Sequence, residues 1–315
     1  MSIAQQFSSA CQLAQEMPGR VAEFIEIDKT LKRRFREDSM TDVLIASFLR
    51  LPGHQVSIDT PIEAKTGSDF DLFIGVRGSL DLTHYRIQAK RLSDRKVWQN
   101  GRYMCIDHRV GAPKTLQADI LCRSSSRGLI PLYAFYNHAN VVSASKGQVD
   151  GISLADAFSV RRAVHKIVAG DTSYKCVGKL MPLFFPMSTI LCSPTPGRSL
   201  ATPSQSRDAA ESAVTSSRNR FTLDLSDAES AEVAILADAF RARAADRAGD
   251  ATREETDEVL RRIQEPTPEA ERQDVLQVVQ SVRDTPLVRH LPIPRPRIIL
   301  IGDGIADDRT PQPHE

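Results

Sequence analysis

Two short runs of alternating apolar and polar residues constrain the fold of this chain more than any other feature. Residues 69–74 read Asp-Phe-Asp-Leu-Phe-Ile, and residues 85–90 read Tyr-Arg-Ile-Gln-Ala-Lys. Because side chains on a β-strand alternate between its two faces, each run has one apolar face and one polar face. A turn that contains glycine and aspartate separates the runs, so together they predict a β-hairpin.

The polar face of this hairpin gathers groups that suit phosphate chemistry. Asp69 and Asp71 share it with Arg86, Gln88 and Lys90. Mg²⁺ binds carboxylate oxygens and activates a bound water, and a lysine offers a compact positive charge to a phosphate. We therefore expect Asp69 to be the main metal ligand, Gln88 to add an amide oxygen and Lys90 to contact the phosphate.

A neutral glutamine supplies no negative charge, so we expect a second carboxylate from elsewhere in the chain. Glu37 and Glu63 are the candidates, and Asp71 could replace or assist Asp69. The plainer interpretation is that the polar residues form the solvated face of an amphipathic hairpin. The nearby charge favours phosphate binding, because residues 85–128 carry ten Lys or Arg against three Asp.

Several motifs follow one another in a distinctive order. In chain order they are an acidic helix start at residues 37–42, Gly67-x-Asp69, Gln88-Ala89-Lys90, a helix with Gln117 and the strand Pro131-Leu132-Tyr133 to Tyr136-Asn137. This order resembles the PD-(D/E)XK nuclease superfamily in its Gln-x-Lys variant, the form found in Mrr-type restriction endonucleases. It is most similar to an uncharacterised bacterial family of restriction-endonuclease-like proteins. The resemblance covers residues 20–195.

The resemblance implies an α/β fold, with a restriction-endonuclease-like mixed central sheet flanked by helices and a mostly helical C-terminal appendage. It implies a metal-dependent nuclease, an Mg²⁺- or Mn²⁺-dependent endodeoxyribonuclease that acts in restriction or anti-phage defence. DNA is the expected substrate, and RNA stays open because nothing in the sequence indicates how a 2′-hydroxyl would be read.

The resemblance also implies roles for individual residues. The catalytic positions would be Asp69, Gln88, Lys90 and Glu37, and all of these except Lys90 would hold the metal. Supporting roles would fall to Asp71, Glu63 and Gln117. The residues expected to bind nucleic acid are Arg86, Arg91, Arg95, Lys96 and Arg102.

The neutral Gln88 keeps a second hypothesis open, because it weakens the expected metal affinity. The chain could be a non-catalytic nucleic-acid-binding or interaction module that retains the nuclease fold. A third hypothesis is a structural protein whose acidic C-terminal helices dock another subunit.

Charge and composition divide the chain into three parts. Residues 1–192 are expected to form the nuclease-like domain, 193–220 a flexible linker rich in Ser, Thr, Pro and Arg, and 221–315 an acidic helical region with a final strand. Residues 221–290 carry sixteen Asp or Glu against nine Lys or Arg, so the excess of positive charge lies in residues 1–220. We expect only residues 1–220 to face nucleic acid. A second copy of the chain, or a partner protein bound through the C-terminal region, would be the protein contact.

The remaining features bound the class of protein. No stretch approaches twenty uninterrupted apolar residues and no secretion signal is visible, so we expect a cytoplasmic protein with no membrane contact. Five cysteines without a Cys-x-x-Cys pair argue against a disulfide framework and structural zinc. Pro18-Gly19 is expected to break the N-terminal helix into two. The apolar run at 297–301 reads as a strand that could return to the edge of the sheet.

Overall fold

A computed structural model gives the fold of the chain. The residues that it describes are 7–31, 36–51, 55–59, 66–76, 81–93, 98–111, 114–123, 129–195, 200–220 and 297–302. Glu63, Arg95 and Lys96 lie outside these ranges, as does the acidic region expected at 221–290.

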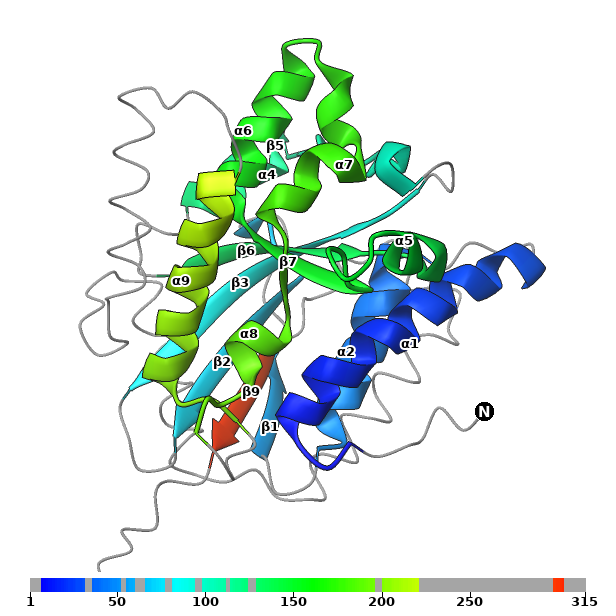
Figure 1. The fold of residues 1–315 in the computed structure, drawn as a ribbon. Coiled ribbons are helices and arrows are strands. Elements are labelled where there is room, and N and C mark those ends of the chain that lie inside the picture. Colours follow the sequence, from blue (N-terminus) through cyan, green and yellow to red (C-terminus); the bar gives the residue numbers. More distant parts are fainter. Residues whose placement is uncertain are drawn as a thin grey trace, which may run out of the picture.

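A mixed β-sheet forms the centre of the described part of the chain, and its strand order is β1-β9-β2-β3-β6-β7-β8 (Figure 1). The strands are β1 Gln55–Asp59, β2 Phe70–Val76, β3 Leu82–Arg91, β6 Ile130–Tyr136, β7 Ile152–Asp156, β8 Phe185–Pro186 and β9 Arg297–Gly302. β3 pairs with β2 in antiparallel fashion and with β6 in parallel fashion. A separate pair joins β4 Arg109–Val110 to β5 Thr115–Leu116.

Helices flank this sheet and confirm the expected α/β fold class. They are α1 Ala10–Leu31, α2 Glu37–Leu49, α4 Gln117–Arg123, α5 Ala139–Ala144, α6 Ala157–Val168, α7 Val177–Leu180, α8 Ser188–Leu191 and α9 Pro203–Arg220. Short 3₁₀ turns span Trp98–Asn100, Thr172–Lys175 and Met181–Leu183. In Figure 1, α1, α2, α8 and α9 lie in front of the sheet, and α4, α6 and α7 gather at its upper end. None of the described helices has the length and apolar character needed to cross a bilayer.

The hairpin predicted from the alternating residues is formed by β2 and β3. Phe70 lies opposite Ile87 and Leu72 opposite Tyr85, so the apolar residues of both strands share one face of the sheet. α9 covers that face, because the Tyr85 hydroxyl lies 2.7 Å from Ser206 Oγ. The polar residues of both strands therefore point to the other face.

α1 is one continuous helix, so the expected break at Pro18-Gly19 is wrong. One side of the helix is buried both before and after the proline, through residues such as Leu13 and Val21. Proline costs a helix interior a hydrogen bond, but packing along a buried face can outweigh that cost.

The linker expected at 193–220 is also wrong for most of its length, because residues 203–220 form α9. The sequence of α9 lacks large apolar residues, and the helix docks instead through hydrogen bonds and small side chains. Arg207 binds Asp81 at 2.9 Å and Thr83 Oγ1 at 3.0 Å, while Ala210 and Val214 are buried.

The final strand exists, but it does not lie at the edge of the sheet. β9 sits between β1 and β2, antiparallel to the first and parallel to the second. Leu300 is fully buried there. A strand with neighbours on both sides is protected from pairing with other chains, which explains its uninterrupted apolar run.

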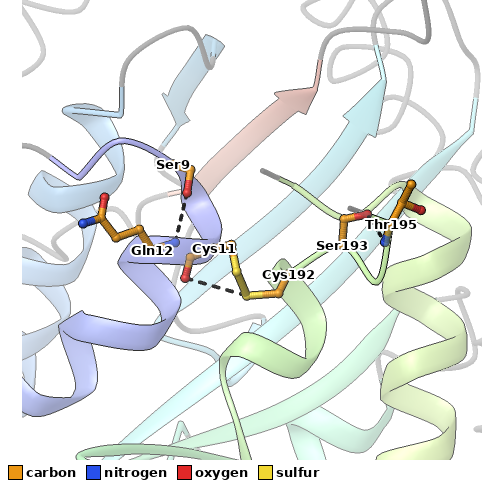
Figure 2. The surroundings of a disulfide bond; sticks show 6 residues. All are labelled: Ser9, Cys11, Gln12, Cys192, Ser193 and Thr195. Carbon is orange, nitrogen blue, oxygen red and sulfur yellow. Dashed lines mark hydrogen bonds between the residues drawn. A yellow bond between two sulfur atoms is a disulfide. The ribbon is translucent and has the colours of Figure 1, made fainter. Parts of the chain in front are cut away.

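A disulfide joins Cys11 in α1 to Cys192 at the end of α8, across 181 residues of sequence (Figure 2). The expectation that the cysteines do not support disulfide bonding is therefore wrong for this pair. The odd number of cysteines obscured this pair, because Cys105, Cys122 and Cys176 are free.

Candidate functional site

The polar face of the β2–β3 hairpin is buried rather than solvated. Arg86, Gln88 and Lys90 are 4%, 1% and 3% exposed, respectively, and Asp71 is fully buried. The plainer interpretation of this face, a solvated surface, is therefore wrong. Buried charges are costly unless they have partners, so the question becomes what each of these groups binds.

Asp69 and Gln88 form the first part of the candidate site. Asp69 lies one residue before β2, and its backbone N–H donates to the Ile87 carbonyl at 2.8 Å. Its carboxylate accepts hydrogen bonds from the Ala89 N–H at 2.6 Å and from the Gln88 side-chain amide. The Gln88 amide also donates to the Ala89 carbonyl at 3.0 Å. The NH₂ group of Gln88 is thus fully used within the protein.

The oxygen of the same amide is not used. Gln88 Oε1 is buried and has no hydrogen-bond partner among the described residues. A buried acceptor of this kind carries a desolvation cost that native proteins rarely leave uncompensated. This oxygen could serve as a ligand, and it belongs to the same amide whose nitrogen donates to Asp69.

Lys90 forms the second part of the site, two residues further along the same face of β3. Its ammonium donates to Glu37 Oε1 at 3.3 Å and to Gln117 Oε1 at 3.2 Å. The other oxygen of Glu37 accepts the Arg91 backbone N–H at 3.2 Å. Glu37 is the first residue of α2 and Gln117 the first residue of α4, so the starts of two helices meet at the lysine.

Tyr133 was not singled out from the sequence, yet it lies beside this cluster. In the parallel pairing of β3 with β6, Gln88 is the register partner of Tyr133. The ring is fully buried, and its hydroxyl has no hydrogen-bond partner among the described residues. Burial raises the pKa of Tyr133 well above its usual range, and the nearby carboxylates of Asp69 and Glu37 raise it further.

Asp71 belongs to a different, closed network. Arg86 donates hydrogen bonds to its carboxylate, from Nε to Oδ1 at 2.9 Å and from Nη2 to Oδ2 at 2.8 Å. His84 Nε2 lies 3.2 Å from Oδ2. Burial alone would raise the pKa of Asp71, but the charges and hydrogen bonds of Arg86 and His84 outweigh it and hold the pKa far below its usual range. Of the two aspartates, Asp69 is the one that shares a hydrogen bond with Gln88, and Asp71 is paired with Arg86.

The residues expected to contact nucleic acid are placed differently from one another. Arg102 is exposed, in an isolated bridge with Cys176. Arg91 is half-buried at the end of β3. Arg86 is buried in its ion pair with Asp71, so its position does not fit a contact with a phosphate backbone.

A divalent cation is the group that the sequence led us to expect here. Among the described residues, no three His, Cys, Asp or Glu side chains gather as a metal cluster. The oxygens that could hold Mg²⁺ are the carboxylates of Asp69 and Glu37 and the amide Oε1 of Gln88, which has no hydrogen-bond partner among the described residues. Mg²⁺ commonly takes one or two carboxylates and fills its remaining positions with water, so this donor set fits the ion.

Fold and site together define an α/β protein with a mixed sheet and a buried cluster of acid, amide and amine side chains. The chain belongs to DUF6615, a family of unknown function whose model matches residues 10–299. That match extends from the start of α1 into β9, so it includes every other strand of the sheet and the first half of β9. No curated protein and no solved structure shows a significant match to the chain.

Proposed function

We propose that this protein is a metal-dependent nuclease that hydrolyses phosphodiester bonds, with DNA as its substrate. The observation that carries the proposal is two neighbouring pairs at one face of the hairpin, Asp69 with Gln88 and Glu37 with Lys90. Asp69, Gln88 and Lys90 share a face of the hairpin, and Glu37 of α2 binds Lys90 from the side. The mixed sheet is compatible with the restriction-endonuclease-like fold, and the basic excess in residues 85–128 supports a polyanionic ligand.

Each group has a task that follows from its surroundings. A bound Mg²⁺ would supply a Lewis acid and a nucleophilic water at neutral pH. Asp69 and Glu37 would hold the ion, and Gln88 would orient Asp69 while offering its own oxygen. Lys90 is kept in place by two acceptors, and its fixed ammonium would stabilise the charge that grows on the phosphate during reaction.

The test is cleavage by the purified full chain of supercoiled plasmid, linear DNA, single-stranded DNA and RNA, with Mg²⁺, Mn²⁺ or EDTA. We expect cleavage that depends on metal and falls at least about 100-fold in Asp69→Asn and Lys90→Met, since each variant removes a charge used in the reaction. The matched controls are Asp107→Asn and Lys175→Met, which break a 2.7 Å ion pair outside the cluster and should leave cleavage unchanged. Metal-dependent cutting that survives in both site variants would overturn the proposal.

One observation favours a second candidate, a module that binds nucleic acid without cutting it. The Lys90 ammonium already has two protein acceptors, and the neutral Gln88 adds no charge for a metal. Such a module would bind DNA or RNA equally well in EDTA, and Asp69→Asn would not change its affinity. A binding assay run beside the cleavage assay separates the two functions.

A further inference from the structure

Tyr133 is the exception among the buried tyrosines. Tyr85, Tyr103, Tyr133 and Tyr136 are all fully buried in the described part of the chain. The hydroxyl of Tyr85 pairs with Ser206 at 2.7 Å, that of Tyr103 with Asn137 at 2.5 Å, and that of Tyr136 with Thr41 at 3.0 Å. Only the Tyr133 hydroxyl lacks a partner among the described residues. Burying a hydroxyl without a hydrogen-bond partner costs free energy. If packing alone determined this position, a phenylalanine would fill it without that cost.

The position of this hydroxyl links it to the other unpartnered atom of the site. Gln88 and Tyr133 are register partners on adjacent strands, so their side chains leave the sheet on the same face. Gln88 Oε1 and the Tyr133 hydroxyl are both buried and both without a hydrogen-bond partner among the described residues. Asp69 binds the Gln88 amide directly. Two neighbouring unsatisfied polar groups beside a carboxylate point to one shared occupant.

The chemistry of the two atoms restricts what that occupant is. An amide oxygen has no proton to give, so it needs a cation or a hydrogen-bond donor. A phenol hydroxyl can both donate and accept, but as a neutral group it is a weak ligand for Mg²⁺ compared with a carboxylate. A hydrated divalent cation would suit both atoms, because it would offer a positive charge to the amide oxygen and a water as hydrogen-bond partner to the hydroxyl.

We propose that Tyr133 is a positioning residue of the metal site, where its hydroxyl holds a water in the hydration shell of the cation bound by Asp69, Glu37 and Gln88. The inference rests on the proposed function, because it takes the same cluster as a metal site. It adds a residue on β6 that the Gln-x-Lys motif on β3 does not contain. Groups that orient a metal's ligands commonly change metal affinity or activity by about 10- to 100-fold when they are removed.

The test compares Tyr133→Phe with Tyr85→Phe in the full chain. Each variant removes one buried hydroxyl, but the Tyr85 hydroxyl has a protein partner on the opposite face of the sheet. The readouts are Mn²⁺ affinity by titration calorimetry, thermal unfolding without metal, and the rate of DNA cleavage. The probe is Mn²⁺ alone, so binding is measured independently of activity.

Tyr133→Phe should weaken Mn²⁺ binding at least about tenfold. Its metal-free unfolding temperature should be equal to or above that of the wild type, because no hydrogen bond is lost. Tyr85→Phe should show the reverse pattern, with unchanged Mn²⁺ affinity and a lower unfolding temperature.

The inference is wrong if Tyr133→Phe binds Mn²⁺ as tightly as the wild type, or if its metal-free form is destabilised as Tyr85→Phe is. If the wild type cleaves DNA while Tyr133→Phe matches it in every readout, only this inference fails; if the wild type does not bind Mn²⁺, the nuclease proposal fails with it.

Discussion

Asp69 and Asp71 are two residues apart in sequence and share one face of the hairpin, yet their surroundings differ. Asp71 is fully buried and gripped by Arg86 through two hydrogen bonds, with His84 at 3.2 Å. Asp69 is half-buried, and its carboxylate accepts hydrogen bonds from the Ala89 N–H and from the Gln88 side-chain amide. The buried ion pair with Arg86 gives Asp71 a structural role as an anchor of the hairpin.

The anchoring role of Asp71 predicts how stability depends on pH. Because its pKa in the folded protein lies far below the ordinary value of 3.8, the ion pair contributes its full stabilisation above that value and loses it progressively as the pH falls further. Asp71→Asn leaves Arg86 buried without its counter-charge and should cost about 3–5 kcal/mol at pH 7.

Urea unfolding of the wild type and Asp71→Asn at pH 7, 4, 3 and 2 checks this. The difference in unfolding free energy should be largest at pH 7 and should shrink below pH 4. A difference that stays constant from pH 7 to pH 2 would show that folding does not lower the pKa of Asp71. Asp107→Asn is the control, since its carboxylate is only partly buried in its pair with Lys175.

At the scale of the elements, the sequence predicted what depends on local spacing. The hairpin follows from the alternation in residues 69–74 and 85–90, and the observed register agrees with it. Glu37 could be placed near Lys90 only through the resemblance, because the two residues belong to elements far apart in the chain. Tyr133 was missed for the same reason, since its place beside Gln88 depends on the pairing of β3 with β6.

α9 shows the opposite error, in which composition misled. Its Ser, Thr and Arg content is typical of a flexible linker, but these side chains face partners that the sequence alone does not reveal. Ser206 binds both Tyr85 and the Ile190 carbonyl, and Arg207 binds Asp81 and Thr83. Hydrogen bonds to a distant strand replace the large apolar residues that a sequence search uses to find a buried helix.

Arg207 is accordingly expected to carry much of the docking of α9. Arg207→Ala should lower the free energy of unfolding by about 1.5–3 kcal/mol, because it removes the charge-assisted hydrogen bonds to Asp81 and the hydrogen bond to the buried Thr83. Arg220→Ala changes an exposed arginine of the same helix and is expected to have little effect. Urea unfolding of the two variants is the measurement. Equal stability of both would mean that α9 is not held by this contact.

At the scale of the whole molecule, the disulfide ties the first described helix to the segment just before α9. Cys11 and Cys192 lie 181 residues apart, so their bond closes a loop that contains most of the sheet. Cross-links of long loops stabilise proteins mainly by restricting the unfolded chain, typically by about 2–5 kcal/mol.

Cys192→Ser should therefore unfold at lower urea concentration than the wild type, and a reducing agent should move the wild type toward the variant. Cys176→Ser, which removes a free cysteine, should change neither. A thiol assay under denaturing, non-reducing conditions should find three free thiols in the wild type. Five free thiols, or no effect of the reducing agent on stability, would contradict this expectation.

The place of β9 has a consequence for how the protein is made. The ribosome delivers β1 and β2 early, but the strand that belongs between them leaves it only after every other described element. At translation rates of about 5–20 residues per second, the nascent chain must carry an open gap in its sheet for on the order of ten seconds or more. During that interval β1 and β2 each expose an unpaired edge, which makes the growing chain a natural client for chaperones. It also means that the sheet beside Asp69 is completed only after residues 297–302 have been made, so any activity at this site would be withheld until then.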